Sequence, residues 1–311
     1  MKLLHALYVL LAILIAGACF FAPRAFVPAD RPEPRAARVL FVGDMMFDRT
    51  IRTIGEEKGY DYLLSCVADY LRGFDLVVGN LEGPITFASS TSAGTVPGQP
   101  GNTSFTFSPA VASLLAEHDV RAVSIGNNHI LDRGPEGVES TQSVLARAGV
   151  TSFGAPGSNA STAVRANGSE IGLVSFNQFL GQNDPARTIR AIGGLKRKGI
   201  PVAVYAHWGD EYVPETDAER SLAHEFIDAG ADVVIGSHPH VIQSFETYKG
   251  RPIYYSLGNF VFDQYWAPEV STGLGVEAVF ADGDVITRAH RFVISRDGRT
   301  CRDPVDNLTN I

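Results

Sequence analysis

The stretch VLFVGDMMFDR, residues 39–49, joins four apolar residues to a glycine and an aspartate. Further along the chain, other apolar runs also end at glycine and polar residues. In order, the five runs end at Gly43-Asp44, Gly79-Asn80-Leu81-Glu82, Gly126-Asn127-Asn128-His129, His207-Trp208-Gly209 and Gly236-Ser237-His238-Pro239-His240. In open α/β sheets, ligands bind at the carboxyl ends of the strands. This pattern therefore predicts an α/β fold with a polar site at one edge.

Short β-rich runs alternate with helical patterns from residue 39 onward, as is typical of α/β proteins. The predicted strands are 39–42, 76–78, 122–125, 171–176, 202–206, 233–235, 253–256 and 275–281. Thr216 and Glu219 predict a capping box that starts a helix, and Gly230 predicts its end. The polar stretch 89–104 predicts a long surface loop.

The residues at the five run ends supply carboxylate, amide and imidazole groups. Together they suit Mn, Fe or Zn, and a carboxylate between two ions would support a site with one or two divalent metals. Each residue alone has an ordinary alternative: Asp44 as a helix cap, Glu82 as a solvated carboxylate, Asn128-His129 as a turn, His207 as a packed core imidazole. His238-Pro239-His240 is the strongest fragment, because an extended backbone places both imidazoles on one side.

The amino-terminal sequence is typical of a targeting signal. Lys2 precedes a mostly apolar run from Leu3 to Ala22, so residues 1–22 are predicted to be a membrane anchor or signal peptide. An uncleaved anchor, cleavage after Ala16-Gly17-Ala18 and lipidation of Cys19 remain alternatives. Residues 23–38 are predicted to be a proline-rich spacer, and 39–311 a single folded domain.

The chain has 311 residues, a net charge of −8 and three cysteines. An acidic chain without a Lys/Arg stripe argues against nucleic acid as a partner. Because Cys19 lies in the leader, at most one disulfide, between Cys66 and Cys301, remains for the domain.

Six motifs resemble those of the CapA family, the bacterial capsule-synthesis proteins associated with poly-γ-glutamate. They are GDMMFDR (43–49), GNLEGPIT (79–86), IGNNHILDRG (125–134), HWGDEY (207–212), GSHPHVIQ (236–243) and YSLGNFVFD (255–263). That family is similar to calcineurin-like metallophosphoesterases, which implies a four-layer α/β/β/α sandwich. The resemblance implies these metal ligands: Asp44, Glu82, Asn128, His207, His238 and His240. It also places His129 facing the substrate.

Two residues depart from the broader superfamily pattern. Met46 stands where the superfamily has a histidine, and Glu82 stands where its bridging carboxylate is usually aspartate. A thioether is a poor ligand for hard divalent ions, so one metal position is expected to be a ligand short.

The resemblance implies an extracytoplasmic, membrane-tethered protein of capsule polymer biosynthesis or export, or a secreted or periplasmic one if the signal is cleaved. We expect a metal-dependent hydrolase that uses a metal-bound hydroxide on an anionic polymer or its phosphorylated carrier. His129 would be the acid, Asp132 would orient it unless it merely starts a helix, and Arg49 would clamp an anion. Glu211 would support a liganding histidine, and Asn259 would shape its loop.

Two alternatives remain open. A non-catalytic assembly or export factor would keep the fold and hold the polymer beside a membrane synthase. A glycan-modifying enzyme would instead use Glu82 and Glu211 as paired carboxylates across a cleft, which leaves the histidines without a role.

Overall fold

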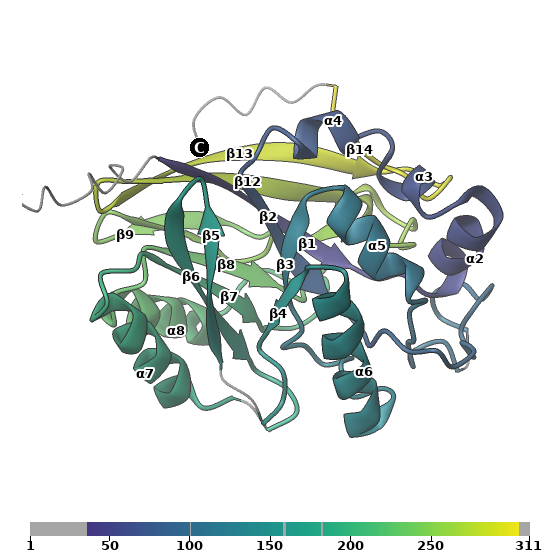
Figure 1. Ribbon diagram of the computed structural model, residues 1–311, viewed down its shortest axis with the longest axis horizontal. Coiled ribbons are helices and arrows are strands. Elements are labelled where there is room, and N and C mark those ends of the chain that lie inside the picture. Colours follow the sequence, from purple (N-terminus) through teal and green to yellow (C-terminus); the bar gives the residue numbers. More distant parts are fainter. Residues whose placement is uncertain (1–35, 100, 158–159, 182, 305–311) are drawn as a thin grey trace, which may run out of the picture. The chain divides into compact units, whose positions relative to one another are not determined.

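The computed structural model describes residues 36–99, 101–157, 160–181 and 183–304. Within them, two sheets lie face to face, with helices on their outer faces (Figure 1). The predicted leader 1–22 and nearly all of the spacer 23–38 lie outside these residues. No helix in the described part of the chain has the length and apolar character needed to cross a membrane.

The larger sheet has eight strands. In spatial order they are β14 (Thr300–Arg302), β13 (Asp284–Ile294), β12 (Thr272–Ala281), β1 (Ala37–Met45), β2 (Leu76–Leu81), β3 (Val120–Ser124) and β4 (Thr151–Phe153), with β11 (Asn259–Val261) paired to the end of β1. Strands β1 to β4 are parallel, whereas β12 runs antiparallel to β1. The carboxyl ends of β1, β2 and β3 therefore meet at one edge.

The smaller sheet has six strands. In spatial order they are β5 (Ser161–Ala166), β6 (Ser169–Asn177), β7 (Val202–His207), β8 (Val233–Ser237), β10 (Arg251–Tyr254) and β9 (Phe245–Tyr248). Strands β6, β7, β8 and β10 are parallel, so β7 and β8 also end at a common edge.

Helices cover the outer face of each sheet (Figure 1). On the larger sheet they are α2 (Arg49–Lys58), α3 (Asp61–Leu64), α4 (Ala68–Leu71), α5 (Ala110–Glu117) and α6 (Gly134–Arg147). On the smaller sheet they are α7 (Pro185–Lys196) and α8 (Asp217–Asp228), and a 3-10 helix, η1 (Pro268–Ser271), precedes β12. The capping box at the start of α8 is confirmed, since Thr216 and Glu219 each accept a hydrogen bond from the other's backbone N–H.

Three buried clusters fill the spaces between the four layers. Because side chains alternate along a strand, Leu40 and Val42 of β1 pack toward the helices, whereas Val39 and Phe41 pack between the sheets. On the smaller sheet, Tyr205 likewise belongs to the cluster between the sheets. The four-layer α/β/β/α sandwich is therefore confirmed.

Each of the eight predicted strands overlaps a strand of the structure. Six further strands were not predicted, namely β4, β5, β9, β11, β13 and β14. Segment 89–104 contains no helix or strand among its described residues. It is not wholly a surface loop, however. Ser92 and Asn102 are buried, and Ser90 Oγ donates to Asp48 Oδ1 at 2.6 Å, so the loop packs against the start of α2.

Cys66 and Cys301 form a disulfide across 235 residues of sequence. It joins the segment between α3 and α4 to the edge strand β14. A cross-link over so long a loop restricts the unfolded chain strongly.

Replacing Cys66 and Cys301 with alanine should lower the free energy of unfolding by about 2–4 kcal/mol, because the unfolded chain regains its freedom. Thermal denaturation of the oxidised protein measures the effect. Cys19→Ala is the matched control, and it should leave the melting temperature unchanged. Equal melting temperatures for all three proteins would show that the bond contributes nothing.

Candidate metal centre

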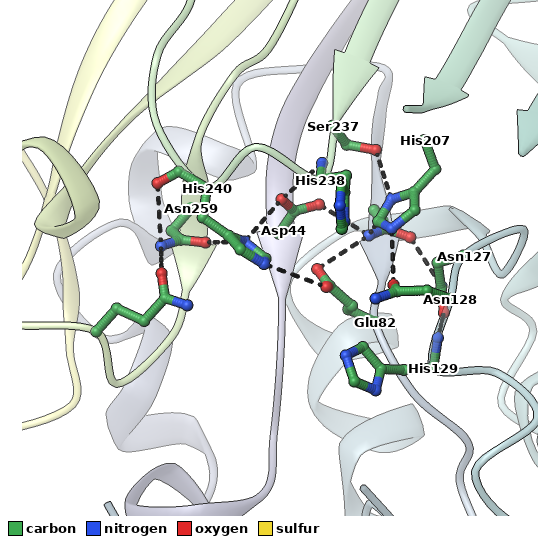
Figure 2. A network of polar contacts seen from close by, with 12 residues as sticks. Asp44, Glu82, Asn127, Asn128, His129, His207, Ser237, His238, His240 and Asn259 are labelled. Carbon is green, nitrogen blue, oxygen red and sulfur yellow. Dashed lines mark hydrogen bonds and ion pairs between the residues drawn. The ribbon is translucent and has the colours of Figure 1, made fainter. Parts of the chain in front are cut away.

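The predicted site residues lie where the carboxyl ends of the two sheets meet (Figure 2). Asp44 ends β1, Glu82 follows β2, and Asn128 lies in the loop after β3. From the smaller sheet, His207 ends β7, and His238 and His240 follow β8. All are buried except Asn128, which is half-buried.

Glycines allow this close approach of strand ends. A Cβ at Gly43 would lie 1.9 Å from the carbonyl oxygen of Gly258, and one at Gly236 would lie 1.8 Å from that of Tyr255. Any larger residue would push β1 away from β11, or β8 away from β10. The glycines at these run ends are therefore required by packing.

The two histidines after β8 adopt unusual backbone angles. His238 has φ 97° and His240 has φ 58°, values that residues other than glycine seldom adopt. Such strain persists only where surrounding contacts hold it, and it concentrates at functional sites.

Asp44 connects the two groups of strands. Its Oδ1 accepts from Asn80 Nδ2 at 2.8 Å, and its Oδ2 accepts from the His238 backbone N–H at 3.1 Å. The same Oδ2 lies 3.2 Å from His240 Nδ1. Asn80 also donates to Glu82 Oε2 at 3.3 Å. Asn80 thus links the two carboxylates, a contact that the motif GNLE (79–82) does not reveal because Asp44 lies on another strand.

His207 faces Asn128 on one side and β8 on the other. Its Nε2 lies 2.9 Å from Asn128 Oδ1, and its Nδ1 lies 3.0 Å from Ser237 Oγ. Its ring centre is 4.8 Å from that of His238. The structure thus brings together all six residues that the sequence singled out.

The buried atoms fit a divalent cation. Glu82, His238 and His240 each offer a ligand atom, and these atoms lie within 4.8 Å of one another. Glu82 Oε1 and His238 Nδ1 are buried without a hydrogen-bond partner. A buried polar atom without a partner costs free energy, which a bound ion would offset. Carboxylate and imidazole donors together suit Zn, Mn or Fe.

Burial and neighbouring charges shift the pKa values of these four groups in different directions. Burial, and then the Asp44 carboxylate, raises the pKa of Glu82 well above its usual range. Burial lowers the pKa of His207 well below its usual range and lowers that of His238 to about 4. Burial opposes the charge of His240, but the Glu82 and Asp44 carboxylates raise its pKa to about 9. His207 and His238 are therefore neutral, the form in which imidazole binds metals.

His129 lies beside the centre, half-buried (Figure 2). Its Nδ1 is 3.0 Å from Asp132 Oδ2, and the ring of Phe105 packs against it at 4.4 Å. Asp132 does not cap a helix: its Oδ2 also accepts from the Phe105 N–H at 2.7 Å, and α6 begins at Gly134.

Arg49 and Met46 both make their contacts with other residues of the protein interior. Arg49 is buried, its Nη2 lies 2.5 Å from Asp263 Oδ1, and its guanidinium lies over Phe105 and Phe262. Met46 belongs to the core beneath the helices, and its sulfur accepts from the Asp48 N–H at 2.9 Å. The Arg49 charge is therefore balanced within the protein.

Asn259 does more than shape its loop. Its Oδ1 lies 3.0 Å from His240 Nδ1, so it contacts a candidate ligand directly. Glu211, by contrast, is exposed. The sequence signal for Asn259 was its motif, YSLGNFVFD, which contains no other amide side chain.

Comparison with known proteins gives a family and several similar proteins. The family model described as bacterial capsule synthesis protein PGA_cap matches residues 38–264. The PGA biosynthesis protein CapA of Bacillus subtilis (strain 168) is 32% identical over 246 residues, covering 73% of this chain and 63% of the relative. The capsule biosynthesis protein CapA of Bacillus anthracis is 31% identical over 278 residues, covering 82% and 66%.

The matched part therefore spans less than two thirds of each of these relatives. Among solved structures, a hypothetical protein from Thermus thermophilus has a TM-score of 0.54 at 19% identity, covering 82% of this chain and 99% of that one. This likeness concerns the fold alone.

Adding Mn²⁺ or Zn²⁺ should stabilise the protein, because the ion binds the folded centre and not the unfolded chain. At a hundred times the dissociation constant, the gain is about 2.7 kcal/mol. Thermal denaturation with metal and with EDTA measures it. His238→Ala should abolish the metal-dependent shift, whereas His224→Ala, on α8, should retain it. An identical shift in both variants would place the ion elsewhere.

Proposed function

The chain belongs to the bacterial capsule synthesis protein family PGA_cap, and from this premise we propose that it serves the biosynthesis of a capsule polymer of the poly-γ-glutamate type. We further propose that it is a metal-dependent hydrolase acting on an anionic polymer or its phosphorylated carrier. The observation that carries the second proposal is the convergence of Glu82, His238 and His240, with two buried ligand atoms that have no hydrogen-bond partner.

The proposed ligands fall into two groups that share Glu82. Asn128, His207 and His238 would hold one ion with it, and Asp44 and His240 would hold the second. A divalent ion bound there would supply a hydrolytic nucleophile at neutral pH and neutralise the charge that develops on the substrate. Because Met46 is committed to the core, it adds no ligand, and the second position is the weaker one.

His129 is the proposed proton donor to the leaving oxygen. The Asp132 carboxylate accepts a hydrogen bond from His129 Nδ1. The other ring nitrogen of His129, Nε2, therefore points away from Asp132. Phe105 packs on the ring and limits its rotation. The pair resembles the general arrangement in which a carboxylate orients a histidine that moves a proton.

Replacing His129 with alanine should lower hydrolysis of a generic phosphodiester, such as bis(p-nitrophenyl) phosphate, by about a hundred-fold. Metal affinity, measured by calorimetry, should be unchanged, since His129 is not a proposed ligand. His118→Ala is the control: His118 is buried at the end of α5 and pairs with Asp61.

A second function is favoured by two observations. Met46 leaves one ion position short, and Arg49 is paired with Asp263 instead of facing a substrate anion. Both suit a non-catalytic factor that holds the polymer beside a membrane synthase. Metal binding without hydrolysis, and unchanged function in cells after His129→Ala, would favour this factor over the enzyme.

For location, we propose an extracytoplasmic domain tethered by the apolar segment 1–22. The sequence of that segment supports this, as does the Cys66–Cys301 disulfide, because disulfides persist mainly outside the cytoplasm.

The native protein should accordingly remain in the membrane pellet after a high-salt wash, with an intact mass that includes Met1. A soluble protein whose mass begins at Cys19 or later would instead establish a cleaved signal. Protease added to intact cells or spheroplasts should degrade the domain, and protection from protease would contradict the outward orientation.

A further inference from the structure

A chain of hydrogen bonds leaves the candidate metal centre through side-chain amides. His240 Nδ1 lies 3.0 Å from Asn259 Oδ1, and Asn259 Nδ2 donates to Gln264 Oε1 at 2.9 Å. Gln264 Nε2 then donates to the Tyr212 hydroxyl at 3.0 Å. His240, Asn259 and Gln264 are 3%, 0% and 4% exposed, whereas Tyr212 is 43% exposed. The chain thus runs from the buried centre to the surface.

The direction of these hydrogen bonds is fixed by the acceptors around Asn259. Its Nδ2 also donates to the backbone carbonyl oxygens of Val270 at 2.9 Å and of His240 at 3.4 Å, so the nitrogen is taken up by acceptors and Oδ1 is the atom that faces the imidazole. Asn259 Oδ1 therefore accepts from His240 Nδ1. The other nitrogen, Nε2, lies 3.5 Å from Glu82 Oε1 and is the atom presented to an ion. A partner that sets which imidazole nitrogen binds metal is a common device in metal sites.

Tyr212 is held firmly at the outer end of this chain. It has φ 64°, and its backbone N–H donates at 2.9 Å to the carbonyl oxygen of Pro239, between the two histidines. Its ring centre is 6.0 Å from that of His240 and 5.6 Å from that of Trp266, which it meets edge-on. Tyr212 and Trp266 both line a cavity of about 820 Å³. Tyr212 is therefore a wall between this cavity and the centre.

We propose that Asn259, Gln264 and Tyr212 are positioning residues for His240, and that they couple the cavity wall to metal binding. This inference rests on the proposed metal centre. Coupling between two sites is reciprocal. A change at Tyr212 must alter metal affinity, and metal binding must in turn restrain Tyr212 and its neighbour Trp266.

The first test is a calorimetric titration of the purified full chain with Mn²⁺ alone. Gln264→Met keeps the bulk of the side chain but removes both hydrogen bonds, and it should weaken Mn²⁺ binding by about ten-fold. Gln243→Met is the matched control. Gln243 is likewise a buried glutamine, but it lines the cavity itself, donates to the Val213 carbonyl oxygen and takes no part in the chain of hydrogen bonds. The Gln243→Met variant should bind Mn²⁺ with the same affinity as the wild type.

The second test measures a change at the outer end of the hydrogen-bond chain, through the fluorescence of Trp266, which contacts Tyr212. The sequence has two tryptophans, of which Trp208 is fully buried and Trp266 is 55% exposed. Acrylamide therefore quenches mainly Trp266. Saturating Mn²⁺ should reduce this quenching in the wild type and in Gln243→Met, but not in Gln264→Met. A role in general stability alone would not produce that difference.

Tyr212→Phe gives an independent test if Gln264→Met does not fold, because it removes only the hydroxyl that accepts from Gln264. It should weaken Mn²⁺ binding a few-fold. If both Tyr212→Phe and Gln264→Met bind Mn²⁺ as the wild type does, the coupling is wrong, while the metal centre stands. If the wild type itself binds no Mn²⁺, both the centre and the coupling are overturned.

Discussion

The buried carboxylate of Asp44 is the interaction on which the rest of the site depends. It accepts hydrogen bonds from Asn80 of the larger sheet and from the backbone of His238 in the smaller one, and it contacts His240. A fully buried carboxylate is tolerated only when its oxygens are satisfied, so the ends of both sheets must stay in place around it. The same contacts hold His238 and His240 at backbone angles that they would not adopt alone. The backbone geometry at His238 and His240 thus depends on this carboxylate.

The sequence predicted most interior strands of both sheets and missed the edge strands, together with the interior strand β13, which is long but has exposed residues along its length. Strands such as β1, β7 and β8 are buried on both faces, and they appear as unbroken apolar runs. The strands at the sheet edges, β14, β4, β5 and β9, are short or half-exposed and carry no such run. Strand β11 has only three residues, and its existence depends on pairing with β1 across the chain. That pairing is tertiary, so no local pattern shows it.

At the site, too, the sequence predicts what a single strand determines and misses what contacts between distant segments determine. The residues at the five run ends were identified from their types and positions, because those are set by the strand on which each residue lies. The contacts of Asn80 and Asn259 at the centre were not predicted, because each depends on a partner from another segment of the chain. The sequence suggests Arg49 as an anion clamp, and it does not show that Asp263, far along the chain, forms an ion pair with it. Ion pairs between distant segments cannot be inferred from one sequence.

The position of β1 within its sheet has a consequence for biosynthesis. The strand is made first, yet it pairs with β12 from Ala37 opposite Phe280 to Val42 opposite Gly275. The pairing of β1 with β2 can form early, but the pairing of β1 with β12 must wait until the ribosome has made most of the domain, and the cross-link to Cys301 closes later still. Contacts so distant in sequence form slowly. Until β12 is made, the edge of β1 that pairs with it has no partner strand, and an unpaired edge of this kind can pair with another chain.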